Sequence, residues 1–159
     1  GVAMLKAGQA APMFVLPDAD MELIDIASFL GRSRLILFFY PRDGAPCCTL
    51  QATDFSDHEE EFARHDCRIF GISRDDCLRH AEFRDEHGIS VSLLADEDRV
   101  VCEQYGVWQA RIVDGVEKFG IVRSTFLIDK QGVLRHAQYG VHAKGHALEM
   151  LRLAKEINT

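Results

Sequence analysis

The sequence lacks any long hydrophobic run and any excess of positive charge. Its longest uninterrupted apolar stretch is Leu35–Tyr40, six residues, whereas a membrane-spanning helix needs about 20. Acidic side chains outnumber basic ones by 25 to 18, for a net charge of −7, and such a charge repels nucleic-acid phosphates and anionic lipid. We therefore expect neither a membrane span nor a nucleic-acid partner.

Cysteine is scarce, with five residues and no C-x-x-C motif. An odd and small number of cysteines does not build a disulfide scaffold, and residues 1–7 show no secretory signal. We therefore expect free thiols and a cytoplasmic location. Hydrophobic residues make up 47% and charged residues 27% of the 159 positions, which predicts one globular domain over residues 1–159.

Segments typical of strands alternate with segments typical of helices. The predicted strands are Leu35–Tyr40, Cys67–Ser73, Ser92–Ala95, Ile121–Asp129 and Val133–Tyr139, with weaker signals at Phe14–Leu16 and Ile24–Leu30. The predicted helices are Cys48–His65, Asp75–His87, Val100–Tyr105 and Ala143–Ile157. This alternation predicts a three-layer α/β/α architecture with a mixed central sheet, because the last two long strands form a hairpin. A thioredoxin-like arrangement fits better than a dinucleotide-binding one, since no GxGxxG follows a strand.

The segment with the clearest chemical meaning joins the first long strand to the first helix. The helix opens near Cys48, after a loop rich in proline and glycine. Ligands of open α/β sheets bind at the carboxyl ends of strands, where this loop must lie. A thiol in the first helical turn faces unpaired N–H groups and the positive end of the helix dipole, which favour the thiolate. We interpret Cys48 as a nucleophile and Cys47 as a small apolar residue of the turn.

Two motifs carry a family resemblance. Residues 40–49 read Tyr-Pro-Arg-Asp-x-x-Pro-x-Cys-Thr, and residues 120–129 read Gly-Ile-Val-Arg-Ser-Thr-Phe-Leu-Ile-Asp. With Phe70–Asp75, Leu93–Asp96 and Tyr105–Trp108 in the same order, the chain resembles the Q-type, or bacterioferritin-comigratory, peroxiredoxins of the AhpC/TSA class. The resemblance implies a thiol peroxidase of antioxidant defence that reduces hydrogen peroxide and alkyl hydroperoxides. It also implies recycling by thioredoxin or a similar dithiol, and no cofactor.

The resemblance assigns roles to individual residues. Cys48 would be the peroxidatic cysteine, Pro41 would shield its thiolate, and Arg123 would hold thiolate and peroxide by charge. Arg123 could instead form an ordinary salt bridge at the rim of the sheet. The positions implied on the substrate side are Tyr40, Ala45 and Cys47.

Four positions depart from the family pattern. Ala45, Cys47, Gln51 and Thr53 stand where the family usually has threonine, glycine, glutamate and, in many members, a resolving cysteine. The missing threonine hydroxyl removes a donor at the reacting centre, which predicts slower chemistry.

The thiol that resolves the oxidised Cys48 is not settled by the sequence. Cys67 and Cys102 resemble core residues, whereas Cys77 begins a helix at the same sheet edge as Cys48. Some Q-type members place a resolving cysteine where Arg84 stands, two helical turns after Cys77. Our hypothesis is a Cys48–Cys77 disulfide; reaction with an external thiol is the alternative. We expect a monomer, or a weak homodimer.

Other constellations give weaker signals. No third ligand accompanies the His142/His146 pair, and we read these residues, with His80 and His87, as surface residues and expect no metal.

Two rival functions use the same fold. A protein disulfide oxidoreductase would need a C-x-x-C motif, and a redox-sensing module without turnover would be separated from an enzyme by steady-state assay.

Overall fold

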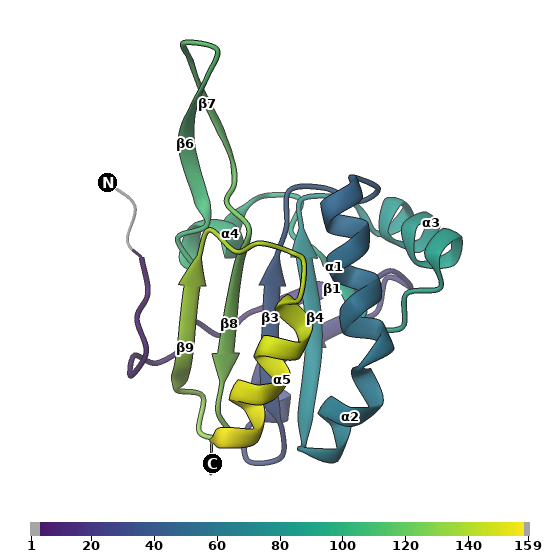
Figure 1. The fold of residues 1–159 in the computed structure, drawn as a ribbon, viewed down its shortest axis with the longest axis vertical. Coiled ribbons are helices and arrows are strands. Elements are labelled where there is room, and N and C mark those ends of the chain that lie inside the picture. The colour runs from purple at the N-terminus through teal and green to yellow at the C-terminus, as the bar shows by residue number, and fades with distance from the viewer. Residues whose placement is uncertain (1–3, 158–159) are drawn as a thin grey trace.

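The computed structural model describes residues 4–157, which form a five-stranded mixed sheet between two unequal layers (Figure 1). The strands are β1 Val15–Pro17, β2 Leu23–Asp25, β3 Arg34–Phe39, β4 Cys67–Ser73, β5 Ser92–Ala95, β6 Trp108–Val113, β7 Val116–Ile121, β8 Ser124–Ile128 and β9 Leu134–Tyr139. The helices are the 3-10 helix η1 Ile26–Phe29 and the α-helices α1 Pro46–Asp57, α2 Glu59–Arg64, α3 Cys77–His87, α4 Val100–Gln104 and α5 His146–Glu156.

The central sheet has the strand order β5-β4-β3-β8-β9. Strands β3, β4 and β5 run parallel, whereas β8 is antiparallel to both β3 and β9. Crossover connections through helices produce the parallel pairs, and the turn at residues 129–133 produces the antiparallel pair β8–β9. The predicted mixed sheet and its late hairpin are confirmed.

Strand β3 is buried on both faces because its side chains alternate between two separate cores. Ile36 and Phe38 pack with apolar residues of α1, α2, α3 and α5, which cover one face. Leu37 and Phe39 pack on the other face with η1, α4 and the segment around β1. In Figure 1, α1, α2 and α5 lie over the front of the sheet. The helix pattern of the sequence therefore gives a three-layer α/β/α protein.

Three predicted elements differ from the structure. Most of the weak strand expected at Ile24–Leu30 is the 3-10 helix η1, and only its first two residues belong to β2. The expected helix over residues 48–65 begins earlier, at Pro46, and breaks at His58, whose φ of −108° and ψ of 6° are not helical. The expected strand over residues 121–129 is also two pieces: Ile121 ends β7, and β8 begins only at Ser124.

Strands β6 and β7 form a hairpin that the sequence analysis did not predict. They pair with each other from Trp108↔Ile121 to Val113↔Val116 and stand away from the body as an arm (Figure 1). The turn is Asp114-Gly115, both with positive φ, of 51° and 76°. An Asp-Gly pair between β-branched residues is a strong hairpin signal, so this element could have been recognised.

In the described part of the chain, no helix has the length and apolar character needed to cross a membrane.

Candidate active site

The loop between β3 and α1 carries Cys48 to the carboxyl edge of the parallel strands. Pro46 occupies the first helical position, where its missing N–H costs no hydrogen bond, and Cys48 follows within the first turn. The capping residue, Ala45, offers no side-chain hydrogen bond to the helix start. Cys48 thus lies in the first turn of α1, whose N–H groups have no partner within the helix. Its side chain is only 1% exposed, so the thiol is shielded from bulk water.

Arg123 lies at the same edge of the sheet, at the start of a strand that runs antiparallel to β3. It lies in the two-residue gap between β7 and β8, not within an apolar strand as expected. Strand β8 is antiparallel to β3, and Ser124 pairs with Phe39 at the end of β3. The beginning of β8 therefore lies beside the end of β3, and Arg123 comes next to the first turn of α1. The carbonyl oxygen of Arg123 accepts hydrogen bonds from the N–H groups of Gly140 and Val141, which hold its backbone.

The guanidinium group of Arg123 links two side chains of α1. Its Nη2 lies 3.2 Å from Sγ of Cys48, and its Nη1 donates to Oε1 of Gln51 at 2.6 Å. Cys48 and Gln51 are three residues apart, so both face the arginine from one side of the helix. This geometry holds a cation against the sulfur and stabilises negative charge on it. The predicted pairing of Cys48 with Arg123 is present, and the rim salt bridge is absent from the ion pairs of the described residues.

Gln51 was noted in the sequence only as a departure from a family pattern. The structure buries it to 1% exposure and places its carbonyl oxygen on Arg123. Because an amide is neutral, it orients the guanidinium without neutralising its charge. Nε2 of Gln51 is buried and has no hydrogen-bond partner. An unpaired buried donor costs about 1–3 kcal/mol.

Pro41, expected to shield the thiolate, and the residues implied on the substrate side have different surroundings. Pro41 and Cys47 are exposed, and Ala45 is half-buried. Tyr40 is fully buried, and its hydroxyl donates to Oδ1 of Asp43 at 2.5 Å. The Tyr40 hydroxyl therefore supports the loop in this conformation, with its donor already engaged.

The remaining cysteines fall into two groups, all with free thiols. Cys67 and Cys102 are buried core residues, as expected; burial raises the pKa of Cys67 to about 12 and that of Cys102 still further. Cys77 is half-buried at the start of α3. Burial, followed by the negative charges of Glu97 and Asp18, raises its pKa, so this thiol stays protonated at neutral pH.

Two of the histidines read as surface residues are in fact buried. His80 is 0% exposed and lies between Asp43 and the carbonyl oxygen of Leu94. His146 is 2% exposed and its Nε2 lies 2.8 Å from Oγ1 of Thr125. A histidine ring can be buried when the fold supplies hydrogen-bond partners for its nitrogens. The spacing of histidines in the sequence does not show whether such partners lie nearby in the fold.

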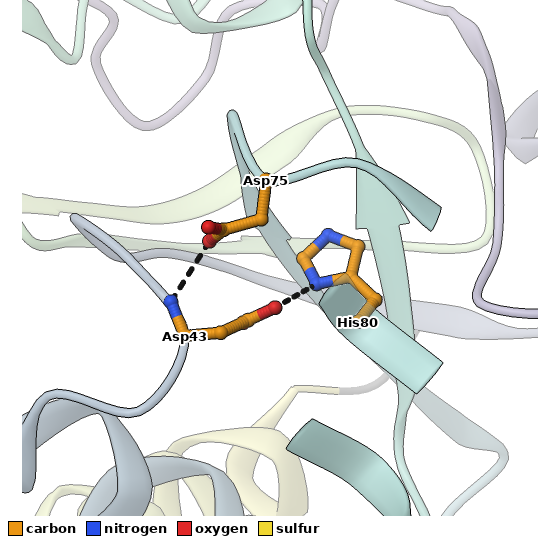
Figure 2. A group of neighbouring side chains, drawn as sticks. All are labelled: Asp43, Asp75 and His80. Atoms are coloured by element: carbon orange, nitrogen blue, oxygen red, sulfur yellow. Dashed lines mark hydrogen bonds and ion pairs between the residues drawn. The ribbon is translucent and has the colours of Figure 1, made fainter. Parts of the chain in front are cut away.

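The sequence analysis also missed the carboxylates that surround His80. Asp43 points its side chain at the ring of His80, and its backbone N–H donates to Oδ2 of Asp75 at 2.8 Å (Figure 2). Asp43 follows β3 and Asp75 follows β4, two adjacent parallel strands. Polar residues just beyond the carboxyl ends of neighbouring parallel strands meet at one edge, and this signal was available in the sequence.

Comparisons with known proteins agree with this geometry. Residues 7–137 match the AhpC/TSA family. Peroxiredoxin Bcp of Bacillus subtilis is 36% identical over 154 residues, which cover 97% of this chain and 98% of the relative. Both Cys48 and Arg123 lie inside the matched range.

Solved structures show the same fold. A cysteine-to-serine mutant of PrxQ from Xylella fastidiosa superimposes with a TM-score of 0.90 at 26% identity, covering 98% of both chains. The bacterioferritin comigratory protein of Xanthomonas campestris, solved in a study of its alkyl peroxide reduction activity, gives a TM-score of 0.87 at 27% identity and covers 98% of both chains. The chain therefore belongs to the AhpC/TSA family and is a peroxiredoxin of the Bcp, or Q, type, a thiol-dependent peroxidase.

Proposed function

We propose that Cys48 is the peroxidatic thiol and that Arg123 is the group that activates it. The observation that carries this assignment is the 3.2 Å contact between Nη2 of Arg123 and Sγ of Cys48. It occurs in the first turn of α1, where unpaired helical N–H groups add to the positive potential. Of the five cysteines, Cys48 has the positive surroundings that a reactive thiolate needs.

The reaction follows from the chemistry of a thiolate and a hydroperoxide. The Cys48 thiolate attacks the terminal oxygen of ROOH, the S–O bond forms, and the O–O bond breaks. The electron pair of that bond leaves on RO⁻, which takes a proton to give ROH, or water from hydrogen peroxide. Cys48 is oxidised to sulfenic acid, and the peroxide is reduced by two electrons. Arg123 stabilises the charge that moves from sulfur to the leaving oxygen.

The substrates we propose are hydrogen peroxide and alkyl hydroperoxides. The alkyl peroxide reduction reported for the Xanthomonas relative supports the second class. In this chain Ala45 offers no hydroxyl at the reacting centre. The donors that remain for the peroxide are the guanidinium of Arg123 and the backbone N–H groups of the first turn of α1.

The sulfenic acid is resolved by a second thiol, with water as the leaving group. Cys77 faces Glu97, which follows β5, whereas Cys48 faces Arg123, which precedes β8. Strands β5 and β8 lie on opposite sides of the β4–β3 pair. A Cys48–Cys77 disulfide therefore requires the start of α3 to unwind. An external thiol could attack Cys48 instead, and in both routes thioredoxin or a similar dithiol supplies the two electrons.

We also propose that the chain works in the cytoplasm as a single domain, as a monomer or a weak homodimer. The free thiols and the absence of a disulfide among the described residues support a reducing compartment.

The test is the intact mass of the reduced protein seconds after one equivalent of hydrogen peroxide. The variants are Cys48→Ser and, as a matched control, Cys67→Ser, which changes a buried thiol of the core. Rapid oxidation in the wild type and in Cys67→Ser, but not in Cys48→Ser, is expected. A gain of about 16 mass units means a sulfenic acid, and a loss of about two means a disulfide. Oxidation that persists in Cys48→Ser would overturn the assignment.

Peptide mapping without reductant then decides the resolving thiol. A peptide that joins Cys48 to Cys77, absent from Cys77→Ser, is expected for the intramolecular route. Wild-type protein that stays at the sulfenic acid until a dithiol is added would instead establish the external route.

A further inference from the structure

A buried chain of hydrogen bonds runs behind the active-site loop and does not touch Cys48. Tyr40 donates to one oxygen of Asp43, and the other oxygen lies 2.6 Å from Nδ1 of His80. Nε2 of His80 lies 2.9 Å from the carbonyl oxygen of Leu94. Tyr40 and His80 are 0% exposed and Asp43 is 2% exposed. These hydrogen bonds join the residue that follows β3, the loop before α1, helix α3 and strand β5 away from water.

The contacts of His80 with Asp43 and with Leu94 together need two hydrogens, one more than a neutral imidazole carries, so one proton is shared between His80 and Asp43. Leu94 offers a carbonyl oxygen, so Nε2 of His80 is the nitrogen that donates to it. Nδ1 then faces a carboxylate oxygen, and a hydrogen must lie between them, on the ring or on the carboxyl group. If that proton leaves, the neutral ring keeps one N–H, which can donate either to Asp43 or to Leu94, so one of the two contacts loses its hydrogen in a site without water.

The same residues do not form a metal site. Ligand atoms of Asp43, Asp75 and His80 lie within 4.8 Å of one another (Figure 2). Both nitrogens of His80 are already engaged, and Oδ2 of Asp75 accepts from the hydroxyl of Ser73 at 2.6 Å and from the N–H of Asp43. The cluster is organised around a proton and not around a cation.

The loop depends on this cluster because helix α1 has no cap of its own. Ala45 makes no side-chain hydrogen bond to the helix start. Asp43, five residues before Cys48, is instead held by its side chain on His80 and by its N–H on Asp75. Gly44 follows with a φ of 85°, a sharp turn that transmits the position of Asp43 to the helix. The place of the Cys48 thiol against Arg123 therefore follows from where Asp43 is held.

We propose that His80 is a positioning residue for the peroxidase reaction. The proton that it shares with Asp43 keeps the active-site loop and the first turn of α1 in the position that places Cys48 against Arg123. The inference rests on the proposed role of Cys48. It gives the oxidation of Cys48 two opposing dependences on pH: the thiolate forms as pH rises, whereas His80 no longer donates to both Asp43 and Leu94 when the shared proton leaves.

Other charged and titratable groups face the Asp43–His80 pair from the elements around it. They are Tyr40, which follows β3, Asp75 from the segment after β4, and Arg79 from α3. Glu82 and Glu86 of α3 line a small pocket together with Asp43. Burial, and then the charge of Asp43, raises the pKa of Tyr40 well above its ordinary value, so its hydroxyl stays protonated throughout the test.

The experiment measures the single-turnover rate constant of Cys48 oxidation by hydrogen peroxide from pH 5 to pH 10. His80→Ala removes the contact, whereas His80→Asn places an amide N–H near Asp43 that does not titrate. Asp43→Asn donates to the neutral ring of His80 and also needs no shared proton. His87→Asn is the matched control, because it makes the same change on α3 at an exposed histidine beside Glu86.

The wild type and His87→Asn are expected to show a bell-shaped profile, with a falling alkaline limb. His80→Ala should be slower by about ten- to hundredfold at neutral pH, the cost of a misplaced reacting group. His80→Asn should restore most of that loss, and both it and Asp43→Asn should lack the falling limb.

Two failures are distinguishable. Oxidation that persists in Cys48→Ser overturns the role of Cys48 itself. Oxidation confined to Cys48, with the profiles of His80→Asn and Asp43→Asn identical to that of the wild type, overturns the positioning role alone. If His80→Ala does not fold, these two variants, checked by circular dichroism, still decide the question.

Discussion

Replacement of Arg123 tests the central feature of the site. The guanidinium donates to Gln51 and contacts the sulfur of Cys48. Arg123→Met keeps most of the apolar length of the side chain and removes the charge and both contacts. Arg123→Lys keeps the charge, but a single ammonium does not reproduce the two-pronged geometry.

The magnitude follows from the kind of interaction that is lost. A hydrogen bond to a charged group contributes about 1.5–3 kcal/mol. With 1.36 kcal/mol for each factor of ten in rate, Arg123→Met should oxidise roughly 10- to 100-fold more slowly than the wild type. Arg123→Lys should lie between the two, because it keeps the positive charge near the sulfur.

The assay is the second-order rate constant of Cys48 oxidation at pH 7, from quenched samples weighed by mass spectrometry. Alkylation by iodoacetamide, which reports the thiolate directly, should slow in parallel. The reasoning is refuted if Arg123→Met oxidises within about threefold of the wild type, a difference of well under 1 kcal/mol. Thermal unfolding checks that each variant is folded.

Three further changes test other features of the site and core. Ala45→Thr should cap α1 and stabilise the protein by about 0.5–2 kcal/mol in urea unfolding, and should speed peroxide reduction; Ala45→Val, of the same shape without the hydroxyl, should do neither. Gln51→Glu removes the unpaired Nε2 and adds a charge against Arg123, and should raise the free energy of unfolding by about 1–2 kcal/mol. Burial lowers the pKa of His146 from its ordinary 6.5. The unfolded chain therefore binds the extra proton first, and stability should fall as pH drops below about 6.5. His146→Gln should flatten that dependence in urea titrations at several pH values, and an unchanged dependence would show that burial of this ring is not its cause.

The sequence was sufficient for the architecture and for the place of the proposed nucleophile. A continuous apolar run ended by proline predicts a doubly buried strand, and β3 is one. The loop and helix opening that follow predict a thiolate at the helix start, where Cys48 lies. These conclusions depend on local periodicity, helix polarity and the direction of parallel strands, which a sequence carries without long-range information.

Only the tertiary structure decided which side chains meet at that edge. Arg123 contacts Cys48 because β8 pairs antiparallel with β3 in one register. The pairing of two strands far apart in the sequence produces no periodic pattern from which it could be predicted. His80 likewise reads as a surface residue on a polar helix, and it is buried because Asp43 and Leu94 supply acceptors from two other elements. Burial of a polar ring depends on partners, and partners separated by 14 or 37 residues are brought together only by the fold.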